Sequence, residues 1–328
     1  MAVPLSILDL ATVDPGGSLR QTFAASVELA QHAERWGYTR LWFAEHHNMP
    51  DIGSSATSVL IGHIAARTST IRVGSGGVML PNHSPLVIAE QFGTLAELFP
   101  GRIDLGLGRA PGGDAHVFQA LRRDPSAAES FPQDVVELQQ LLGPEQPGQQ
   151  VRAVPGQGTG VPLYILGSSL FGAHLAAALG LPYAFASHFA PNALADALRV
   201  YRAEYRPSEE RPEPYAMVAM NLFAADTEAE AQEHHTAALR RRVALFTRRG
   251  LPVSDADADR VLASPTGDQI RHMMRHSAVG TAEQVAEQVS GFVSDTDADE
   301  VIVAAGGTTP AARLHSAELL ARGWGLTG

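Results

Sequence analysis

Short β-rich runs alternate with longer helical patterns along the whole chain, and this rhythm leaves few folds open. Runs rich in β-branched and aromatic residues predict eight strands, at residues 4–9, 39–43, 71–75, 102–106, 162–166, 183–186, 215–223 and 300–304. Helical periodicity predicts helices at residues 19–36, 54–67, 85–99, 172–179, 192–205, 227–249, 281–293 and 310–322. Such alternation is typical of βα units that build a parallel sheet.

Eight strands that are each followed by a helix close most naturally into a (β/α)8 TIM barrel, an α/β fold whose active site lies at the carboxyl ends of the strands. Two spacings exceed the length of one βα unit, at residues 109–161 and 250–280, and we interpret them as insertions after strands 4 and 7. The composition does not change along the chain. We therefore expect residues 1–328 to form one barrel domain.

Composition excludes several classes of function. Apolar residues make up 45% of the chain, which suffices for a buried core. The formal net charge is −11 and the basic residues are scattered, so we do not expect nucleic-acid binding through phosphate neutralisation. The absence of cysteine excludes disulfides, thiolate metal sites and a cysteine nucleophile. Without a signal-peptide pattern or a run of 18 apolar residues, the sequence predicts a cytoplasmic protein with no membrane contact.

The cluster Glu45-His46-His47 follows the apolar run at residues 41–44, where a barrel strand is expected to end. Barrel enzymes place catalytic groups at this position. Because consecutive strand residues alternate between faces, one or two of the three side chains can share a pocket. No HExxH spacing accompanies them, so we predict no metal site. The pattern favours a functional site over a structural pair of histidines.

Glycine-rich turns follow three neighbouring predicted strands. The turn GSGG at residues 74–77 lets the backbone approach a flat ligand, although an ordinary βα loop uses glycine as well. The turn GLGR at residues 106–109 lies one strand away from GSS at residues 167–169, which opens a helix. Arg109, the two serines and the free N–H groups of the helix predict a phosphate site, and a simple helix cap by serine is the alternative.

The other histidines carry weaker signals. His188 follows strand 6 at the expected active-site end of the barrel, so we expect it either to line the pocket or to be structural. His234 and His235 lie in a polar helical stretch and are predicted to be surface residues. Trp42 is predicted to be a core aromatic. The acidic run at residues 295–300 is predicted to be a solvated turn.

Taken together, three stretches resemble the luciferase-like flavin monooxygenase family. They are LWFAEHH at residues 41–47, VGSGGVMLPNH at residues 73–83 and RIDLGLGR at residues 102–109, in this order and each at a strand end. The resemblance extends over nearly the whole barrel and is closest to the single-gene bacterial branch of the family rather than to the light-emitting enzyme.

The resemblance implies an FMN site at the carboxyl-terminal mouth of the barrel. It implies that His46 lies beside the isoalloxazine ring and acts on the flavin or the substrate, with His47 as its neighbour. It places Gly76 and Gly77 under the ring, where the family has a cis peptide bond without proline. It further implies cofactor contacts from Glu45, phosphate contacts from Arg109, Gly167, Ser168 and Ser169, and a substrate pocket lined by Met79 and His188.

Two positions depart from bacterial luciferase. This chain has Gly108 where that enzyme has a cysteine just before the matching arginine, and no long mobile lid is recognisable. The run GGTT at residues 306–309 is shorter and less aromatic than the resemblance leads us to expect. Light emission and a long-chain aldehyde substrate are therefore not predicted.

The resemblance implies an enzyme that uses reduced FMN and O2 to oxygenate a small organic substrate. A separate flavin reductase is the expected source of reduced FMN, because the sequence has no GxGxxG fingerprint for a dinucleotide. An F420-dependent oxidoreductase of the same fold and a non-catalytic flavin-binding protein are the alternatives. The family pairs subunits through helices that correspond to residues 54–67 and 85–99, so we also expect a homodimer.

Overall fold

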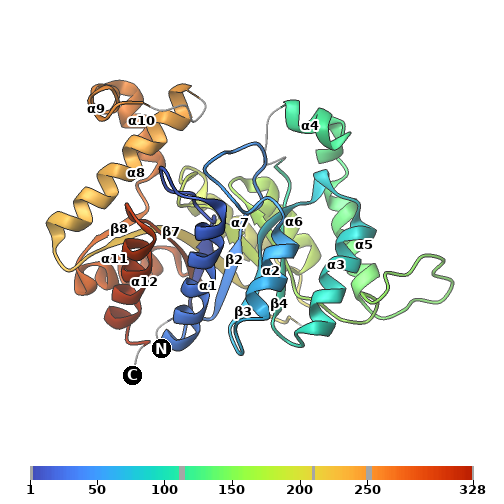
Figure 1. The fold of residues 1–328 in the computed structure, drawn as a ribbon. Coiled ribbons are helices and arrows are strands. Elements are labelled where there is room, and N and C mark those ends of the chain that lie inside the picture. The colour runs from blue at the N-terminus through green and yellow to red at the C-terminus, as the bar shows by residue number, and fades with distance from the viewer. Residues whose placement is uncertain (1–2, 111–114, 209–210, 249–252, 327–328) are drawn as a thin grey trace.

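The structure is a computed structural model that describes residues 3–110, 115–208, 211–248 and 253–326. Parallel strands close into a barrel with helices around it (Figure 1). The barrel strands are β1 (Leu5–Asp9), β2 (Arg40–Phe43), β3 (Arg72–Met79), β4 (Ile103–Gly108), β5 (Leu163–Gly167), β6 (Tyr183–Phe185), β7 (Ala216–Ala224) and β9 (Glu300–Ala305). Strand β9 pairs with both β7 and β1, which closes the ring. The predicted (β/α)8 barrel is confirmed.

Helices form the outer layer and bury their apolar faces on the sheet. They are α1 (Leu19–Trp36), α2 (Thr57–Ala65), α3 (Pro85–Leu98), α5 (Phe131–Leu142), α6 (Leu170–Leu179), α7 (Leu194–Glu204), α11 (Ala282–Thr296) and α12 (Pro310–Trp324). Their buried residues join those of the strands in one continuous apolar core. In the ranges that the structure describes, no helix is both long and apolar enough to cross a membrane.

The two predicted insertions carry additional elements. Residues 109–161 include α4 (Ala115–Leu121), η2 (Pro125–Ala128) and α5, and residues 250–280 include α9 (Asp255–Leu262), α10 (Pro265–Met273) and β8 (Ser277–Gly280). Helix α8 (Glu228–Arg248) corresponds to the helix predicted at residues 227–249. In Figure 1, α4 on one side and α9 and α10 on the other rise above the same end of the barrel. The sequence analysis missed β8, which has four residues and pairs in parallel with the end of β7.

Strand β3 is longer than predicted. It runs to Met79, four residues past the predicted end, and includes a cis peptide bond between Gly76 and Gly77, as the resemblance implied. A Cβ atom on Gly77 would stand 2.7 Å from the carbonyl oxygen of Gly106 on β4, so only glycine allows this approach of the two strands. The predicted end of the helix at residues 227–249 lies outside the described residues.

Two surface predictions were wrong. His234 is 8% exposed, because the loop after β9 covers it and Thr308 Oγ1 lies 3.4 Å from its Nδ1. The His235 ring packs against Phe223, with the ring centroids 5.2 Å apart. In the acidic run, Glu300 is fully buried as the first residue of β9 and does not lie in a solvated turn.

Buried ionic groups fill the amino-terminal end of the barrel. Arg40 forms a bidentate ion pair with Glu300 through Nε and Nη2, at 2.9 and 3.0 Å, and its Nη1 lies 2.8 Å from Asp104. Two tyrosine hydroxyls complete the network. Arg40 Nη1 donates to the Tyr164 hydroxyl at 2.7 Å, and the Tyr215 hydroxyl donates to Glu300 Oε2 at 2.7 Å. Because each buried charge has a partner of opposite sign, this layer can close the bottom of the barrel without unpaired charge.

Candidate active site

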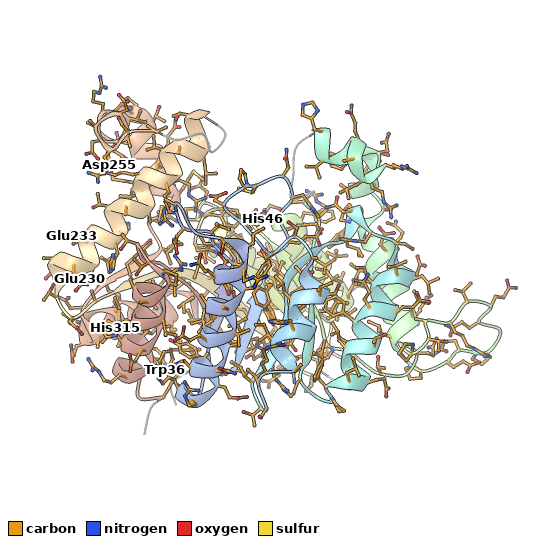
Figure 2. All side chains as sticks on the ribbon, viewed as in Figure 1. Trp36, His46, Glu230, Glu233, Asp255 and His315 are labelled. Atoms are coloured by element: carbon orange, nitrogen blue, oxygen red, sulfur yellow. The ribbon has the colours of Figure 1, made fainter. Side chains whose placement is uncertain are left out.

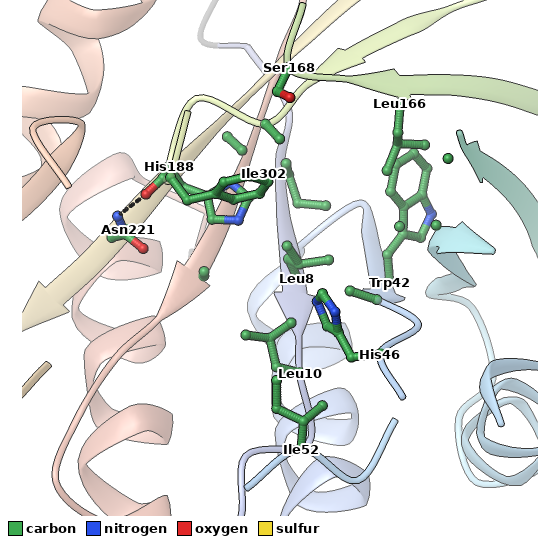
Figure 3. Close-up of a pocket in the computed structure, with 18 of the residues that line it drawn as sticks. Leu8, Leu10, Trp42, His46, Ile52, Leu166, Ser168, His188, Asn221 and Ile302 are labelled. Carbon is green, nitrogen blue, oxygen red and sulfur yellow. Dashed lines mark hydrogen bonds between the residues drawn. The ribbon is translucent and has the colours of Figure 1, made fainter. Parts of the chain in front are cut away.

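A cavity of about 570 Å³ opens at the carboxyl ends of the barrel strands. Strand ends, the loops that follow them and one face of α8 form its wall, and apolar side chains dominate the lining. Figure 3 shows the side chains of Leu8, Trp42 and Ile302 in this pocket. Trp42 is buried as predicted, and its indole also lines the cavity. The volume lies in the range of small-molecule and cofactor sites.

His46 lines the cavity in the loop that follows β2, three residues after the end of the strand (Figures 2 and 3). Burial lowers the pKa of His46, although the nearby Glu45 carboxylate works in the opposite direction. The imidazole is therefore neutral near pH 7. Within the described part of the chain, no group forms a hydrogen bond with its ring, so both ring nitrogens remain available to a ligand.

Glu45 and His47 lie outside the cavity lining and bind each other instead. His47 Nε2 donates to Glu45 Oε1 at 2.7 Å, and His83 Nε2 lies 2.9 Å from the same oxygen. The backbone N–H of Met79 donates to Glu45 Oε2 at 3.0 Å. Burial works to raise the pKa of Glu45, but the hydrogen bonds from His47, His83 and Met79 outweigh it and hold the pKa at about 2. The arrangement ties the end of β2 to the end of β3.

Met79 and the two glycines of the cis peptide line the cavity, at the end of β3. A Cβ atom on Gly108 would stand 2.9 Å from the Met79 sulfur. The thioether of Met79 thus occupies the space that a side chain at position 108 would need.

Arg109 and residues 167–169 line the same cavity. Ser169 is the N-cap residue of α6 and makes no side-chain cap hydrogen bond. Its hydroxyl therefore does not occupy the first N–H groups of the helix. The hydroxyl of Tyr183 donates to the Ser169 carbonyl at 3.1 Å and holds the start of α6. The Arg109 guanidinium stacks 3.9 Å from the Phe171 ring centroid. A guanidinium, serine hydroxyls and helix N–H groups form a donor set that suits phosphate.

His188 also lines the cavity and is 9% exposed. Asn221 Nδ2 donates to its backbone carbonyl at 2.7 Å, which is the hydrogen bond drawn in Figure 3. Burial is the main cause that lowers the pKa of His188 to about 3, and the charges of Arg242 and His46 act in the same direction. Its buried Nδ1 has no hydrogen-bond partner among the described residues.

Sequence reasoning missed the residues that α8 contributes to the cavity. Arg241, Arg242 and Leu245 line it, although the helix appeared polar and surface-exposed from its sequence. Three consecutive positions spread over about 200° around a helix axis, so the run RRR at residues 240–242 places its arginines on different sides of α8. Asn221, inside β7, was missed as well.

Known proteins share much of the sequence of this chain. The sequence profile of the family described as luciferase-like monooxygenase matches residues 3–299. The chain belongs to the luciferase-like monooxygenase family. A luciferase-like monooxygenase of Escherichia coli K12 is 49% identical over 322 residues, covering 97% of this chain and 96% of its own. The N-acetyl-S-alkylcysteine monooxygenase of Bacillus subtilis 168 is 34% identical over 303 residues, covering 88% of both chains.

Solved structures of similar proteins share the fold of this luciferase-like chain. The crystal structure of apo-MsnO8 has a TM-score of 0.90 at 34% identity and covers 99% of this chain and 98% of its own. The oxygenating constituent of 3,6-diketocamphane monooxygenase from Pseudomonas putida, in complex with FMN, has a TM-score of 0.70 at 18% identity over 98% of this chain and 97% of its own. An F420-dependent secondary alcohol dehydrogenase has a TM-score of 0.74 at 14% identity and covers both chains fully. The last two similarities show the fold alone.

Proposed function

We propose that this protein is an FMN-dependent monooxygenase that acts on a small organic substrate. One observation carries the proposal: the same cavity holds hydrogen-bond donors that suit a phosphate, at Arg109 and the start of α6, and the neutral ring of His46 without a hydrogen-bond partner among the described residues. Membership of the luciferase-like family supports the reaction class. We also propose that residues 1–328 form a single barrel domain.

The residues divide the work by position. Arg109, the hydroxyls of Ser168 and Ser169 and the first N–H groups of α6 would hold the phosphate of FMN. The backbone of Gly76 and Gly77 would pass close to the flat ring, since no side chain stands between them and the cavity. When bound, reduced FMN supplies the electrons that activate O2.

His46 would act at the reacting centre. Its neutral ring can accept a proton at one nitrogen and donate one at the other, which is the requirement for general acid–base work near pH 7. The apolar lining would exclude water from the site and strengthen each polar contact inside it. His47 and Glu45 would support this geometry from behind, through their mutual hydrogen bond, without touching the cofactor.

A separate flavin reductase would deliver the reduced FMN. The P. putida structure is described as an oxygenating constituent, which agrees with a division of labour between two proteins. The second candidate cofactor is F420, because an F420-dependent dehydrogenase shares the fold. A flavin-binding protein without catalysis is the third possibility, and it would bind FMN without consuming O2 in the presence of any substrate.

The test is a titration of the protein with FMN and with F420, in which the fluorescence of each cofactor reports its binding. We expect wild-type protein to bind FMN more tightly than F420, and Arg109→Ala to weaken FMN binding by at least about tenfold, since a charge-assisted hydrogen bond contributes about 1.5–3 kcal/mol. Arg199→Ala removes the same charge from an exposed pair with Asp196 and serves as the control. Wild-type protein that binds neither oxidised nor reduced FMN would overturn the proposal, and preference for F420 would select the second candidate.

A further inference from the structure

The cavity is lined by more arginines than the proposed phosphate site uses. Among the described residues that line it, the charged side chains other than histidine are four arginines and a single carboxylate, Asp51; the arginines are Arg109, Arg241, Arg242 and Arg313. The protein as a whole has a net charge of −11. A cationic cavity in an acidic protein indicates an anionic ligand.

Three of the four arginines already have a carboxylate partner or belong to the proposed phosphate site. Arg313 forms a bidentate pair with Asp14, at 2.8 and 3.0 Å, and Arg241 lies 3.7 Å from the same carboxylate. Arg109 stacks on Phe171 beside the phosphate-type donor set at the start of α6. The remaining cation of the lining is Arg242, near the middle of α8.

Arg242 has no hydrogen bond, ion pair or ring contact with any described residue. Burial lowers its pKa, and no carboxylate acts to raise it. Arg242 is half-buried in the cavity wall, and a partly desolvated guanidinium is less favourable without a partner of opposite charge than with one. Such a group is expected where a ligand, rather than the protein, supplies the counter-charge.

His188 lines the same cavity as Arg242. The guanidinium charge contributes to the lowered pKa of His188 and also to that of His46. The buried Nδ1 of His188 has no partner in the described chain, and the bond from Asn221 fixes the backbone of the residue. The two residues therefore line one cavity, each with a polar group that no described residue satisfies.

We infer that Arg242 and His188 form a receptor for a carboxylate on the organic substrate. The planar guanidinium matches a carboxylate with two parallel hydrogen bonds, and the imidazole can donate a third. The flavin phosphate does not need this site, because Arg109 and the start of α6 offer a separate donor set. The inference deepens the proposed function and rests on it for the role of the carboxylate-bearing molecule as substrate.

The experiment measures the preference of the cavity for a carboxylate over a neutral analogue of the same shape. Phenylacetate and phenylacetamide are titrated by calorimetry into protein loaded with oxidised FMN. We expect wild-type protein to bind phenylacetate at least about tenfold more tightly than phenylacetamide. Arg242→Gln should abolish this preference, and Arg242→Lys should retain part of it because the charge remains.

Arg240→Gln is the matched control. It removes the same charge from the same helix, but Arg240 faces away from the cavity and pairs with Asp255 and Asp259 at 3.0 and 2.7 Å. The preference for phenylacetate should survive this substitution. Thermal unfolding separates binding from folding, because removal of an unpaired, half-buried charge should leave Arg242→Gln at least as stable as wild type.

Three results would overturn the inference that Arg242 and His188 bind a carboxylate. They are equal binding of the two compounds by wild-type protein, no measurable binding of phenylacetate, and a preference that persists in Arg242→Gln. A loss of FMN affinity in Arg242→Gln with unchanged phenylacetate preference would assign the arginine to the flavin instead. If wild-type protein fails to bind FMN, the same titration without FMN still tests the receptor, so failure of the proposed function is distinguishable from failure of this inference.

Discussion

The carboxylate of Glu45 offers a direct test of how the site is held together. It is 1% exposed and accepts hydrogen bonds from His47, His83 and the N–H of Met79. Substitution by glutamine keeps the size of the side chain but removes the charge and replaces one accepting oxygen with a donor. The amide then faces donors that it cannot satisfy, and the link between the ends of β2 and β3 is weakened.

The magnitude follows from the pKa of Glu45, which falls from 4.5 to about 2 in the folded protein. At about 1.4 kcal/mol per pKa unit, this fall corresponds to a stabilisation on the order of 3 kcal/mol near neutral pH. Because the folded pKa is the lower one, the stabilisation is present above pH 4.5 and is lost as the pH falls toward 2. Glu45→Gln should therefore cost about 3 kcal/mol at neutral pH and progressively less in acid.

Urea unfolding, measured at neutral pH and again near pH 3.5, gives the free energy of unfolding for each variant. Glu145→Gln is the control: it loses an exposed pair with Arg152, its side chain is 52% exposed, and the change should stay within about 0.5 kcal/mol. A free-energy difference between wild type and Glu45→Gln that is equally large at both pH values would refute the electrostatic reasoning. No difference at neutral pH would refute it as well.

Three further outcomes are expected. Arg40→Met leaves the buried carboxylate of Glu300 without a counter-charge, while Asp104 keeps its pair with Arg72, and should lower the free energy of unfolding by about 3–5 kcal/mol, whereas Arg199→Met in an exposed pair should cost at most about 1 kcal/mol. His46→Ala should lower substrate-dependent O2 uptake about 100-fold and keep FMN affinity within about tenfold; unchanged uptake would remove His46 from the mechanism. Val59 is 69% exposed on α2, and Val59→Glu should convert the expected homodimer into monomers in light scattering, an expectation that a monomeric wild type would contradict.

The barrel and the position of its mouth were predictable because they depend on local patterns. Each barrel strand is a short apolar run, and hydrophobic periodicity reports such runs directly. The cavity residues at strand ends were predictable for the same reason: His46 and Arg109 immediately follow such runs, and parallel strands bring their carboxyl ends together. The cis peptide bond came from the family resemblance, because no local pattern in the sequence indicates it.

Features that depend on distant partners were not predictable. Glu300 closes an acidic run and appears solvated in sequence, yet its counter-charge Arg40 lies 260 positions away on a neighbouring part of the barrel. The alternation rule allowed two of the residues Glu45, His46 and His47 to share a pocket, but hydrogen bonds to His47 and His83 turn Glu45 away from it. Burial of His234 likewise depends on the loop after β9, which no helical pattern reveals.

The two ends of the barrel use buried charge in opposite ways. At the amino-terminal end, Arg40 meets Glu300 and Asp104 in a set that needs nothing from outside the protein. At the carboxyl-terminal end, the half-buried guanidinium of Arg242 and the buried Nδ1 of His188 have no partner among the described residues, although burial disfavours them as well. A barrel able to compensate charge internally at one end has no structural need for an unpaired guanidinium at the other. The uncompensated groups therefore mark the part of the cavity where a bound molecule must supply the missing charge.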